Sequence, residues 1–309
     1  MLKSKHLIGL EHFPTSDLNK IIDTSFKFKE ILESPERKAI LLKGKTIVNM
    51  FFENSTRTKI SFTLAEKRLG ADSINFSSST SSVKKGETLK DTIQNIDAMK
   101  IDGAVIRHGH PGSALKLTEY IDGAVINVGD GSHEHPTQAI LDMVTLKEKF
   151  GKIKNLKVGI IGDILNSRVA RSDIFALKKL GAKIVVCGPS TLLPSNAKQL
   201  GVNITHNIEE VLSWCDVVIG LRIQLERMHL GRIPSKREYH SEFGLTYERI
   251  SKLKKDIVIM HPGPMNRGVE IDSKIADSEN AVILDQVLNG VASRMSILYL
   301  LLADKPENL

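Results

Sequence analysis

The sequence predicts an α/β protein of two domains, each a mainly parallel sheet flanked by helices. The chain has 309 residues, which exceeds the usual size of one domain. Short apolar runs alternate with segments of helical periodicity, a pattern typical of parallel sheets. This alternating series occurs twice along the chain, and a long helical pattern separates the two series.

The first series opens with a helical segment, because apolar residues recur at helical spacing over 18–26. Four short, mostly apolar runs are expected to be buried strands. They span residues 46–52, 71–76, 102–108 and 123–129. A helix is expected over 136–151, since Pro136 suits a first-turn position and Gly151 suits the end of a helix.

The second series also contains four expected strands and a helix over 170–181. The strands span residues 156–163, 182–188, 216–222 and 256–264. The final helix, about 286–303, is apolar nearly all round in its last turns and should therefore pack between other elements. We place the first domain at 1–136 and the second at 137–286, with 287–309 packing back on the first.

The composition and charge of the chain indicate which ligands and which cellular settings are compatible with the sequence. There are 43 basic and 36 acidic residues, a net charge of +7, which fits anionic ligands without choosing between a phosphate metabolite and a nucleic acid. The basic residues are scattered and aromatic residues reach only 5%, which disfavours a binder of nucleic acids. The chain has neither a signal-peptide pattern nor a run of about 18 apolar residues, so we expect neither secretion nor insertion in a membrane.

The two cysteines, Cys187 and Cys215, both lie inside apolar, strand-like runs. Buried thiols are expected there, with a disulfide as the less favoured alternative. This usage predicts a reducing, cytoplasmic setting.

Polar residues directly follow the expected strands, where open parallel sheets bind ligands. The first such group comprises Ser55, Thr56, Arg57 and Thr58. If a helix begins near Thr56, its first N–H groups and its dipole favour an anion, and the hydroxyls and the arginine suit phosphate oxygens. The alternative is that Ser55 only caps the helix and Arg57 is a solvated surface residue.

Other segments of the first domain also carry residues that could bind an anion. Ser81, Lys84 and Lys85 lie in a serine-rich segment that could reach over an anion or into a neighbouring subunit, although a lysine pair is usually a solvated surface. Arg107 follows an apolar strand directly, which favours a role in a site.

In the second domain, Arg168, Arg222 and Gln224 each come just past an expected strand. The planar guanidinium groups of two arginines suit the two carboxylates of a dicarboxylate ligand. The alternative is that both arginines are surface residues at strand ends.

Four histidines in two H-x-H pairs invite a metal site, completed by Asp130 or Asp163. They are His108, His110, His133 and His135. No cysteine joins them, and the adjacent Arg107 would repel a metal ion, so the metal site stays an alternative. The run 158–163 lacks the glycine spacing of a dinucleotide site. Because no nucleophile triad or P-loop appears, catalysis would rest on orientation and electrostatic stabilisation.

Taken in order, seven segments of the chain resemble the carbamoyltransferase family, and more closely its aspartate branch. They are STRT (55–58), SSVKKGETLKDT (81–92), IRH (106–108), GDGSHEHPTQ (129–138), GDILNSRVARS (162–172), LRIQLER (221–227) and HPGPMNRGVEI (261–271). The resemblance implies transfer of the carbamoyl group of carbamoyl phosphate to L-aspartate, an early step of pyrimidine synthesis, without cofactor or metal.

The resemblance also assigns residues. The implied carbamoyl-phosphate ligands are Ser55, Thr56, Arg57, Thr58, Arg107, His135, Gln138, Pro262 and Gly263, with Ser81 and Lys85 supplied by the adjacent subunit of a homotrimer. The implied aspartate ligands are Lys85, Arg168, Arg222 and Gln224. Catalysis would fall to His135, Arg107, Thr58 and Lys85, with His135 donating to the carbamoyl oxygen and the departing phosphate taking the amine proton.

The ornithine branch of this family is the rival, because it shares STRT and HPTQ. Its members carry a serine-methionine-glycine motif and HCLP where this chain has LRIQLER and HPGP. Arg222 at that place favours an anionic acceptor. This chain has Asn166 and Gly263 where many relatives have histidine and leucine. A regulatory chain or a dihydroorotase partner is left open by the resemblance.

Overall fold

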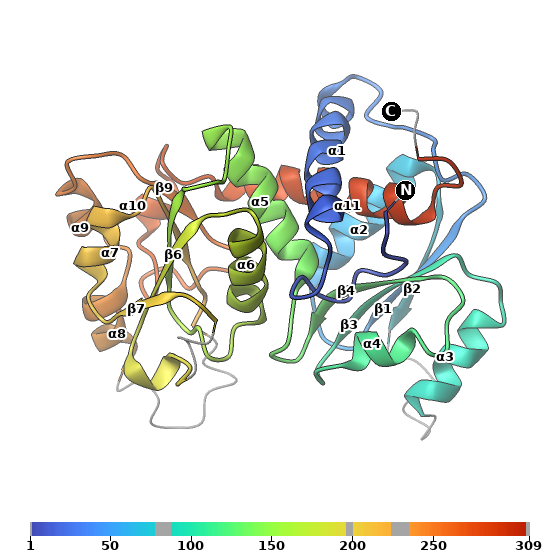
Figure 1. Ribbon diagram of the computed structural model, residues 1–309, viewed down its shortest axis with the longest axis horizontal. Helices are drawn as coiled ribbons and strands as arrows, with labels where there is room; N and C mark the ends of the chain where they lie inside the picture. Colours follow the sequence, from blue (N-terminus) through green and yellow to red (C-terminus); the bar gives the residue numbers. More distant parts are fainter. Residues whose placement is uncertain (1, 78–87, 196–199, 224–234, 307–309) are drawn as a thin grey trace. The chain divides into compact units, whose positions relative to one another are not determined.

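The structure, a computed structural model, describes residues 2–77, 88–195, 200–223 and 235–306. The chain divides into two compact units (Figure 1). Unit 1 comprises Met1–Val144 and Leu288–Leu309, and unit 2 comprises Thr145–Val287.

Unit 1 contains a four-stranded parallel sheet with the strand order β2-β1-β3-β4. Its strands are β1 (Thr46–Phe51), β2 (Asp72–Ser77), β3 (Gly103–His108) and β4 (Ala124–Asp130). Its helices are α1 (Thr15–Glu33), α2 (Thr56–Leu69), α3 (Leu89–Asp97) and α4 (Ser113–Leu117). Helices α3 and α4 cover one face of the sheet, and α1 and α2 lie on the other (Figure 1).

Alternation along the strands explains these two faces. Val48 and Met50 of β1 pack with Ile93 of α3 and with Leu117 of α4 in one apolar cluster. Residues between them in β1, such as Asn49, face α2 instead. Each face of the sheet is thus covered, which accounts for the nearly continuous apolar character of the strands.

Unit 2 contains a five-stranded parallel sheet with the order β7-β6-β5-β8-β9. Its strands are β5 (Lys157–Ile161), β6 (Lys183–Cys187), β7 (Asn203–Thr205), β8 (Val217–Gly220) and β9 (Val258–Met260). The described helices between β5 and α11 are α6 (Arg168–Lys179), η3 (Ser190–Leu192), α7 (Ile208–Trp214), α8 (Lys236–Phe243), α9 (Tyr247–Ser251) and α10 (Ser273–Ala276). Helices α5 (Pro136–Phe150) and α11 (Ile283–Leu302) contribute residues to both units.

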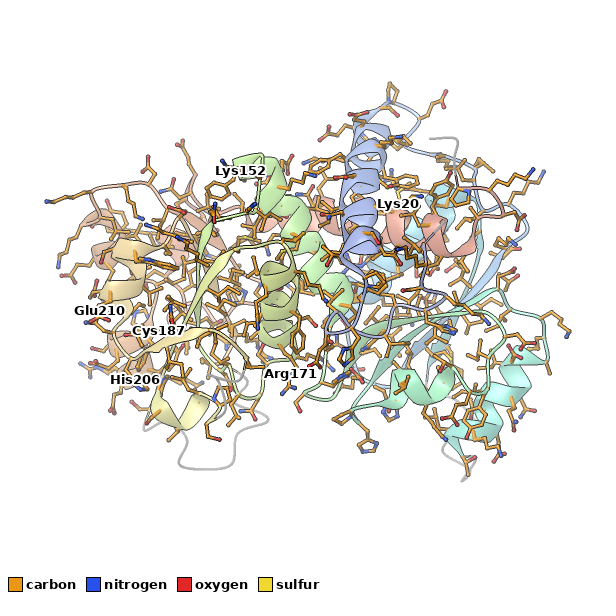
Figure 2. All side chains as sticks on the ribbon, viewed as in Figure 1. Lys20, Lys152, Arg171, Cys187, His206 and Glu210 are labelled. Carbon is orange, nitrogen blue, oxygen red and sulfur yellow. The ribbon has the colours of Figure 1, made fainter. Side chains whose placement is uncertain are left out.

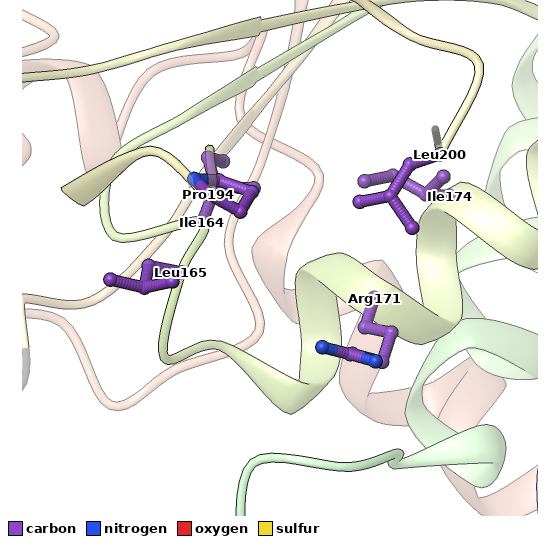
Figure 3. Close-up of a pocket in the computed structure, with 6 residues that line it drawn as sticks. All are labelled: Ile164, Leu165, Arg171, Ile174, Pro194 and Leu200. Atoms are coloured by element: carbon purple, nitrogen blue, oxygen red, sulfur yellow. The ribbon is translucent and has the colours of Figure 1, made fainter. Parts of the chain in front are cut away.

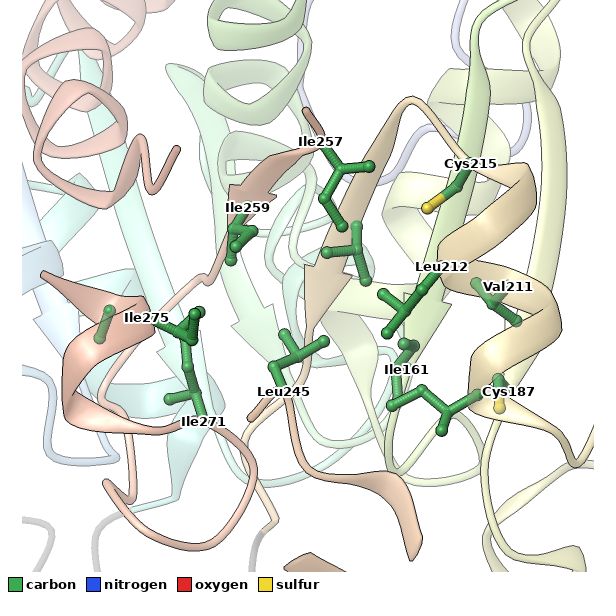
Figure 4. Close-up of a cluster of buried hydrophobic side chains, with 13 residues drawn as sticks. Ile161, Cys187, Val211, Leu212, Cys215, Leu245, Ile257, Ile259, Ile271 and Ile275 are labelled. Atoms are coloured by element: carbon green, nitrogen blue, oxygen red, sulfur yellow. The ribbon is translucent and has the colours of Figure 1, made fainter. Parts of the chain in front are cut away.

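The core of unit 2 includes both cysteines (Figure 4). Cys187 and Cys215 are free, and burial raises the pKa of each thiol to about 12. These thiols therefore stay protonated and act as packing groups. The expectation of buried thiols is confirmed.

Polar contacts join the end of β7 to α7 at the edge of the second sheet. Figure 2 labels His206 and Glu210 in this region. The Thr205 hydroxyl donates to Glu210 Oε2 at 2.9 Å, and the side chain of Asn207 caps α7 by accepting the N–H of Glu209 at 3.0 Å. His206 Nδ1 lies 2.9 Å from the carbonyl oxygen of Gly188.

The predicted fold class is confirmed, since both sheets are parallel and flanked by helices. The helix expected over 136–151 is α5, and the final helix begins slightly earlier than expected, at Ile283. Among the described residues, no helix is long and apolar enough to cross a membrane.

Candidate active site

The amino end of α2 lies just past the carboxyl end of β1. Ser55 is the N-cap of this helix with extended backbone (φ −159°, ψ 90°), but its side chain makes no capping hydrogen bond. The Ser55 side chain therefore does not act as a capping acceptor here, and the assignment of this segment as an anion site stays a prediction. Thr56 and Arg57 are exposed in the first turn, while Thr58 is buried. Such a helix end directs N–H groups and positive dipole charge toward an anion.

Arg107 lies at the same edge of the sheet. It pairs in register with Phe51 of β1, and its carbonyl oxygen accepts the N–H of Phe52 at 2.9 Å. Its Nη1 donates to the carbonyl oxygen of Val128 at 3.3 Å, and its Nε lies 3.6 Å from Oε2 of Glu53. These contacts fix a half-buried guanidinium beside the residues that lead into α2.

The segment between β4 and α5 is organised by the buried carboxylate of Asp130. Its oxygens accept hydrogen bonds from Asn127 Nδ2 at 2.8 Å, the Gly112 N–H at 2.8 Å and the Glu134 N–H at 3.2 Å, and His133 Nδ1 lies 3.1 Å away. Burial opposes ionisation, but these hydrogen bonds outweigh it and lower the pKa of Asp130. A fixed negative charge therefore holds the turn that precedes His135.

His135 directly precedes α5 and is buried. Its carbonyl oxygen accepts the N–H of Gln138 at 3.0 Å, and its Nδ1 lies 3.5 Å from the hydroxyl of Thr137. One turn further, Gln138 Nε2 donates to both carboxylate oxygens of Asp142, at 3.2 and 3.3 Å. The ring of His135 and the amide of Gln138 are thus both held at the start of α5.

The remaining histidines of the two pairs have local roles. His108 Nδ1 accepts the N–H of His110 at 3.0 Å and lies 2.8 Å from the hydroxyl of Ser113, and burial lowers the pKa of His108. Within the described ranges, no group of three or more histidine, cysteine or acidic side chains could hold a metal ion.

In unit 2, Arg168 is the first residue of α6 and is buried. Ser167 caps this helix by accepting the N–H of Ala170 at 3.1 Å. Arg222 is half-buried, two residues past the end of β8. Arg168 thus begins the helix that follows β5, and Arg222 follows β8; these two strands are neighbours in the sheet.

The loop after β9 carries Pro262 and Gly263. Gly263 has a left-handed backbone (φ 61°), which favours glycine, and its N–H donates to Nδ1 of His261 at 2.8 Å. Asn266 in the same loop donates from Nδ2 to the carbonyl oxygen of Ile223 at 3.0 Å. This bond ties the loop to the segment that carries Arg222.

A small cavity in unit 2 holds none of the predicted site residues (Figure 3). Its volume of about 20 Å³ has room for roughly one water molecule. Its lining residues are Ile164, Leu165, Arg171, Ile174, Pro194 and Leu200.

Three predicted site residues, Ser81, Lys85 and Gln224, lie outside the described residues. Two buried acids beside predicted ligands were missed as site residues by the sequence reasoning, Glu134 and Asp142. Asp142 follows Gln138 by four positions, and this helical spacing is the signal that could have identified it.

Two family models match the chain. The model described as "Aspartate/ornithine carbamoyltransferase, carbamoyl-P binding domain" matches residues 5–148, and the "Asp/Orn binding domain" model of the same family matches 154–301. The aspartate carbamoyltransferase catalytic subunit of Christiangramia forsetii is 55% identical over 300 residues, with 97% of each chain covered. That of Cytophaga hutchinsonii is 53% identical, over 98% of this chain and 99% of its own.

Solved structures agree with the sequence relatives. Aspartate transcarbamoylase from Trypanosoma cruzi in complex with carbamoyl phosphate has a TM-score of 0.90 at 29% identity, covering 98% of this chain and 97% of its own. Ornithine carbamoyltransferase from Pyrococcus furiosus has a TM-score of 0.85 at 28% identity, covering 96% of each chain. The chain belongs to the aspartate/ornithine carbamoyltransferase family.

Proposed function

We propose that this enzyme transfers the carbamoyl group of carbamoyl phosphate to the amine of L-aspartate. The products are N-carbamoyl-L-aspartate and phosphate, an early step of pyrimidine biosynthesis. The observation that carries this proposal is the match, along nearly the whole chain, to aspartate carbamoyltransferase catalytic subunits at 55% and 53% identity. A solved relative from Trypanosoma cruzi is in complex with both carbamoyl phosphate and aspartate, with a TM-score of 0.88.

The phosphate binds at the amino end of α2. Ser55, Thr56, Arg57 and Thr58 supply backbone and side-chain donors, and the nearby Arg107 adds a planar fork of donors. The position of Arg107 beside the residues that lead into α2 supports this assignment. By the family resemblance, Ser81 and Lys85 of an adjacent subunit complete the phosphate ligands.

The carbamoyl group is polarised by cationic and hydrogen-bonding groups. His135 donates to the carbonyl oxygen, with Thr58 and Arg107 as further donors, so negative charge that develops on this oxygen is stabilised. Gln138 and the carbonyl oxygens of Pro262 and Gly263 hold the amide end, as the resemblance assigns them. Removing the His135 ring should slow turnover about 100- to 1000-fold.

The aspartate carboxylates are held by Arg168 and Arg222, with Gln224 and Lys85 as further ligands by resemblance. The amine attacks the carbamoyl carbon, a tetrahedral intermediate forms, and the bond to the phosphate oxygen breaks. The departing phosphate accepts the amine proton, so no protein side chain is required as a base. Orientation and charge stabilisation then supply the rate enhancement.

The proposed assembly is a cytoplasmic homotrimer whose active sites are shared between subunits. The trimer follows from the family resemblance, which assigns Ser81 and Lys85 to the neighbouring chain's site, and the cytoplasmic setting follows from the buried, free cysteines. A shared site would make the isolated chain inactive. Unit 1 would serve as the carbamoyl-phosphate-binding domain and unit 2 as the aspartate-binding domain.

The test is product formation by the purified protein from carbamoyl phosphate with L-aspartate and, separately, with L-ornithine. We expect carbamoyl-aspartate from the first and no product from the second. Turnover with ornithine would overturn the assignment of the acceptor. The same assay with a chelator tests the metal-dependent alternative, and the proposed mechanism predicts an unchanged rate.

A further inference from the structure

The amide of Gln138 is held in one orientation by Asp142. Both residues lie on α5, one turn apart, and both belong to unit 1. Gln138 Nε2 lies 3.2 Å from Oδ1 and 3.3 Å from Oδ2 of Asp142, whose side chain is fully buried. An ionised carboxylate only accepts hydrogen bonds, so the donor end of the Gln138 amide must face it.

The negative charge of Asp142 is supported by Arg294 of α11. Burial lowers the pKa of Arg294 to about 10, and the charge of Asp142 opposes this change. Arg294 therefore stays positively charged at neutral pH, and its guanidinium carbon lies 5.3 Å from the ring centre of Phe62 on α2. This cation favours the ionised, acceptor-only form of Asp142.

The other end of the Gln138 amide, the Oε1 acceptor, then faces away from the carboxylate. A carbamoyl group carries an NH₂ donor where an acetyl group carries a methyl. A fixed acceptor can distinguish the two, because a methyl would leave it without a hydrogen bond.

We propose that Asp142, supported by Arg294, is a positioning residue that fixes Gln138 as an acceptor and thereby sets the preference for carbamoyl phosphate over acyl phosphates that lack an NH₂ group. This inference rests on the proposed function, in which Gln138 contacts the carbamoyl amide. Asp142 itself touches no substrate in this account.

The test is the substitution Asp142→Asn, with dissociation constants for carbamoyl phosphate and acetyl phosphate measured by calorimetry on the full chain without aspartate. The new side-chain amide can donate to Gln138 Oε1, which lets the Gln138 amide turn its donor end toward the ligand. We expect affinity for carbamoyl phosphate to fall about ten-fold or more. Affinity for acetyl phosphate should change by less than about two-fold, because its methyl makes no such bond.

A second variant perturbs Arg294, the cation that supports the negative charge of Asp142. A Cβ at Gly290 of α11 would lie 2.5 Å from Nη1 of Arg294 and 3.3 Å from Cδ2 of Leu141, so Gly290→Ala must displace the guanidinium while it changes neither Asp142 nor Gln138 itself. It should weaken binding of carbamoyl phosphate selectively, and to a smaller degree than Asp142→Asn. This variant keeps the test informative if Asp142→Asn does not fold.

The matched control is Asp17→Asn. Asp17 is also a buried carboxylate of unit 1, and it accepts the N–H groups of Lys3 and Ser4 at 2.9 and 3.0 Å. Its loss should lower stability without changing the ratio of the two affinities.

Equal losses for both ligands in Asp142→Asn, or no loss for either, would overturn the positioning role while leaving the proposed function intact. If the wild-type chain bound acetyl phosphate as well as carbamoyl phosphate, the assignment of Gln138 and with it the inference would fall. A wild type that binds neither ligand would overturn the proposed function itself.

Discussion

Glu66 of α2 is buried and contacts Asn49 of β1 and Ser73 of β2. It is not one of the predicted ligand residues. Asn49 Nδ2 donates to its Oε2 at 2.8 Å, and the Ser73 hydroxyl donates to the same oxygen. Burial is the dominant effect and raises the pKa of Glu66 from 4.5 to about 7. The folded protein therefore holds a proton that the unfolded chain has already released at about pH 6.

The expected consequence is a stability that falls as pH rises from about 4.5 to about 7 and then levels off. The folded state binds more protons than the unfolded state in this window, so raising the pH favours unfolding. The contribution of Glu66 is on the order of 3 kcal/mol. Glu66→Gln keeps the shape and removes the titration, and urea unfolding across this pH range should show a flatter profile than wild type.

The same pH slope in wild type and Glu66→Gln would contradict this account of Glu66.

At the residue scale, the sequence placed Arg107 at a strand end and a helix start near Thr56, because apolar runs and hydroxyl clusters mark both. It could not show that Asp142 orients Gln138, since that contact depends on rotamers and on Arg294, which lies 152 positions further along the chain.

At the scale of elements, the N-terminal segment 6–11 is part of the structure that holds the residues before α5. Leu7 pairs with β4, donating to the Val125 carbonyl at 2.9 Å and accepting the N–H of Asn127 at 2.8 Å. The N–H groups of Leu10 and Glu11 donate to the buried carboxylate of Glu134 at 2.8 and 3.2 Å. Glu134 directly precedes His135, so this segment helps to position the ring.

Gly9→Ala tests this role, because a Cβ at Gly9 would lie 2.4 Å from Oε1 of Glu134. The carboxylate must move, and the adjacent His135 should move with it. We expect kcat to fall about 10- to 100-fold, since small displacements of the proposed catalytic group His135 should cost that much. Steady-state kinetics at saturating substrates, with the melting temperature of each variant, provide the measurement.

Asp17→Asn is the matched control, because it loosens residues 3 and 4, just before this segment, without touching Glu134. If Gly9→Ala and Asp17→Asn lowered the melting temperature equally and also had the same kcat, the segment would have a purely structural role, and the proposed positioning of His135 would be contradicted.

Elements with weak local signals could not be predicted. Strand β7 spans only Asn203–Thr205 and is largely exposed, so it shows no apolar run. It exists as a strand because it pairs with Val185–Cys187 of β6, a tertiary contact. Helices α8, α9 and α10 are similarly short, and side-chain caps such as Ser235 and Thr246 mark the starts of α8 and α9 better than their periodicity does.

At the scale of the whole molecule, two parallel sheets belong to two units, and α5 and α11 pass from one unit to the other. The compact units divide after Val144 and after Val287, while the two family models are separated by residues 149–153. The sequence-based boundary at 136 marks the start of α5, where the pattern changes, and it stays a prediction for the functional domains.

A shared active site predicts complementation between inactive chains. Lys85→Ala and Arg107→Ala should each abolish activity, but subunit exchange in a mixture should restore it. A site with Arg107 from one chain and Lys85 from its neighbour is intact in about a quarter of random pairings at equal amounts. The assay is carbamoyl-aspartate formation before and after exchange.

Arg107→Ala mixed with His135→Ala is the matched control, because both residues belong to the same chain's part of the site. No pairing of those two variants restores a complete site, so the mixture should stay inactive. Recovery in the control, or none in the test mixture, would contradict the shared trimer.

The most direct test of the account is a crystal structure of this chain with N-(phosphonacetyl)-L-aspartate, the ligand in a solved Trypanosoma cruzi relative. The account predicts the phosphonate at the amino end of α2, within hydrogen-bond distance of the first-turn N–H groups and of Arg107. It also predicts the aspartate carboxylates on Arg168 and Arg222. A phosphonate bound away from α2, or carboxylates that contact neither arginine, would contradict it.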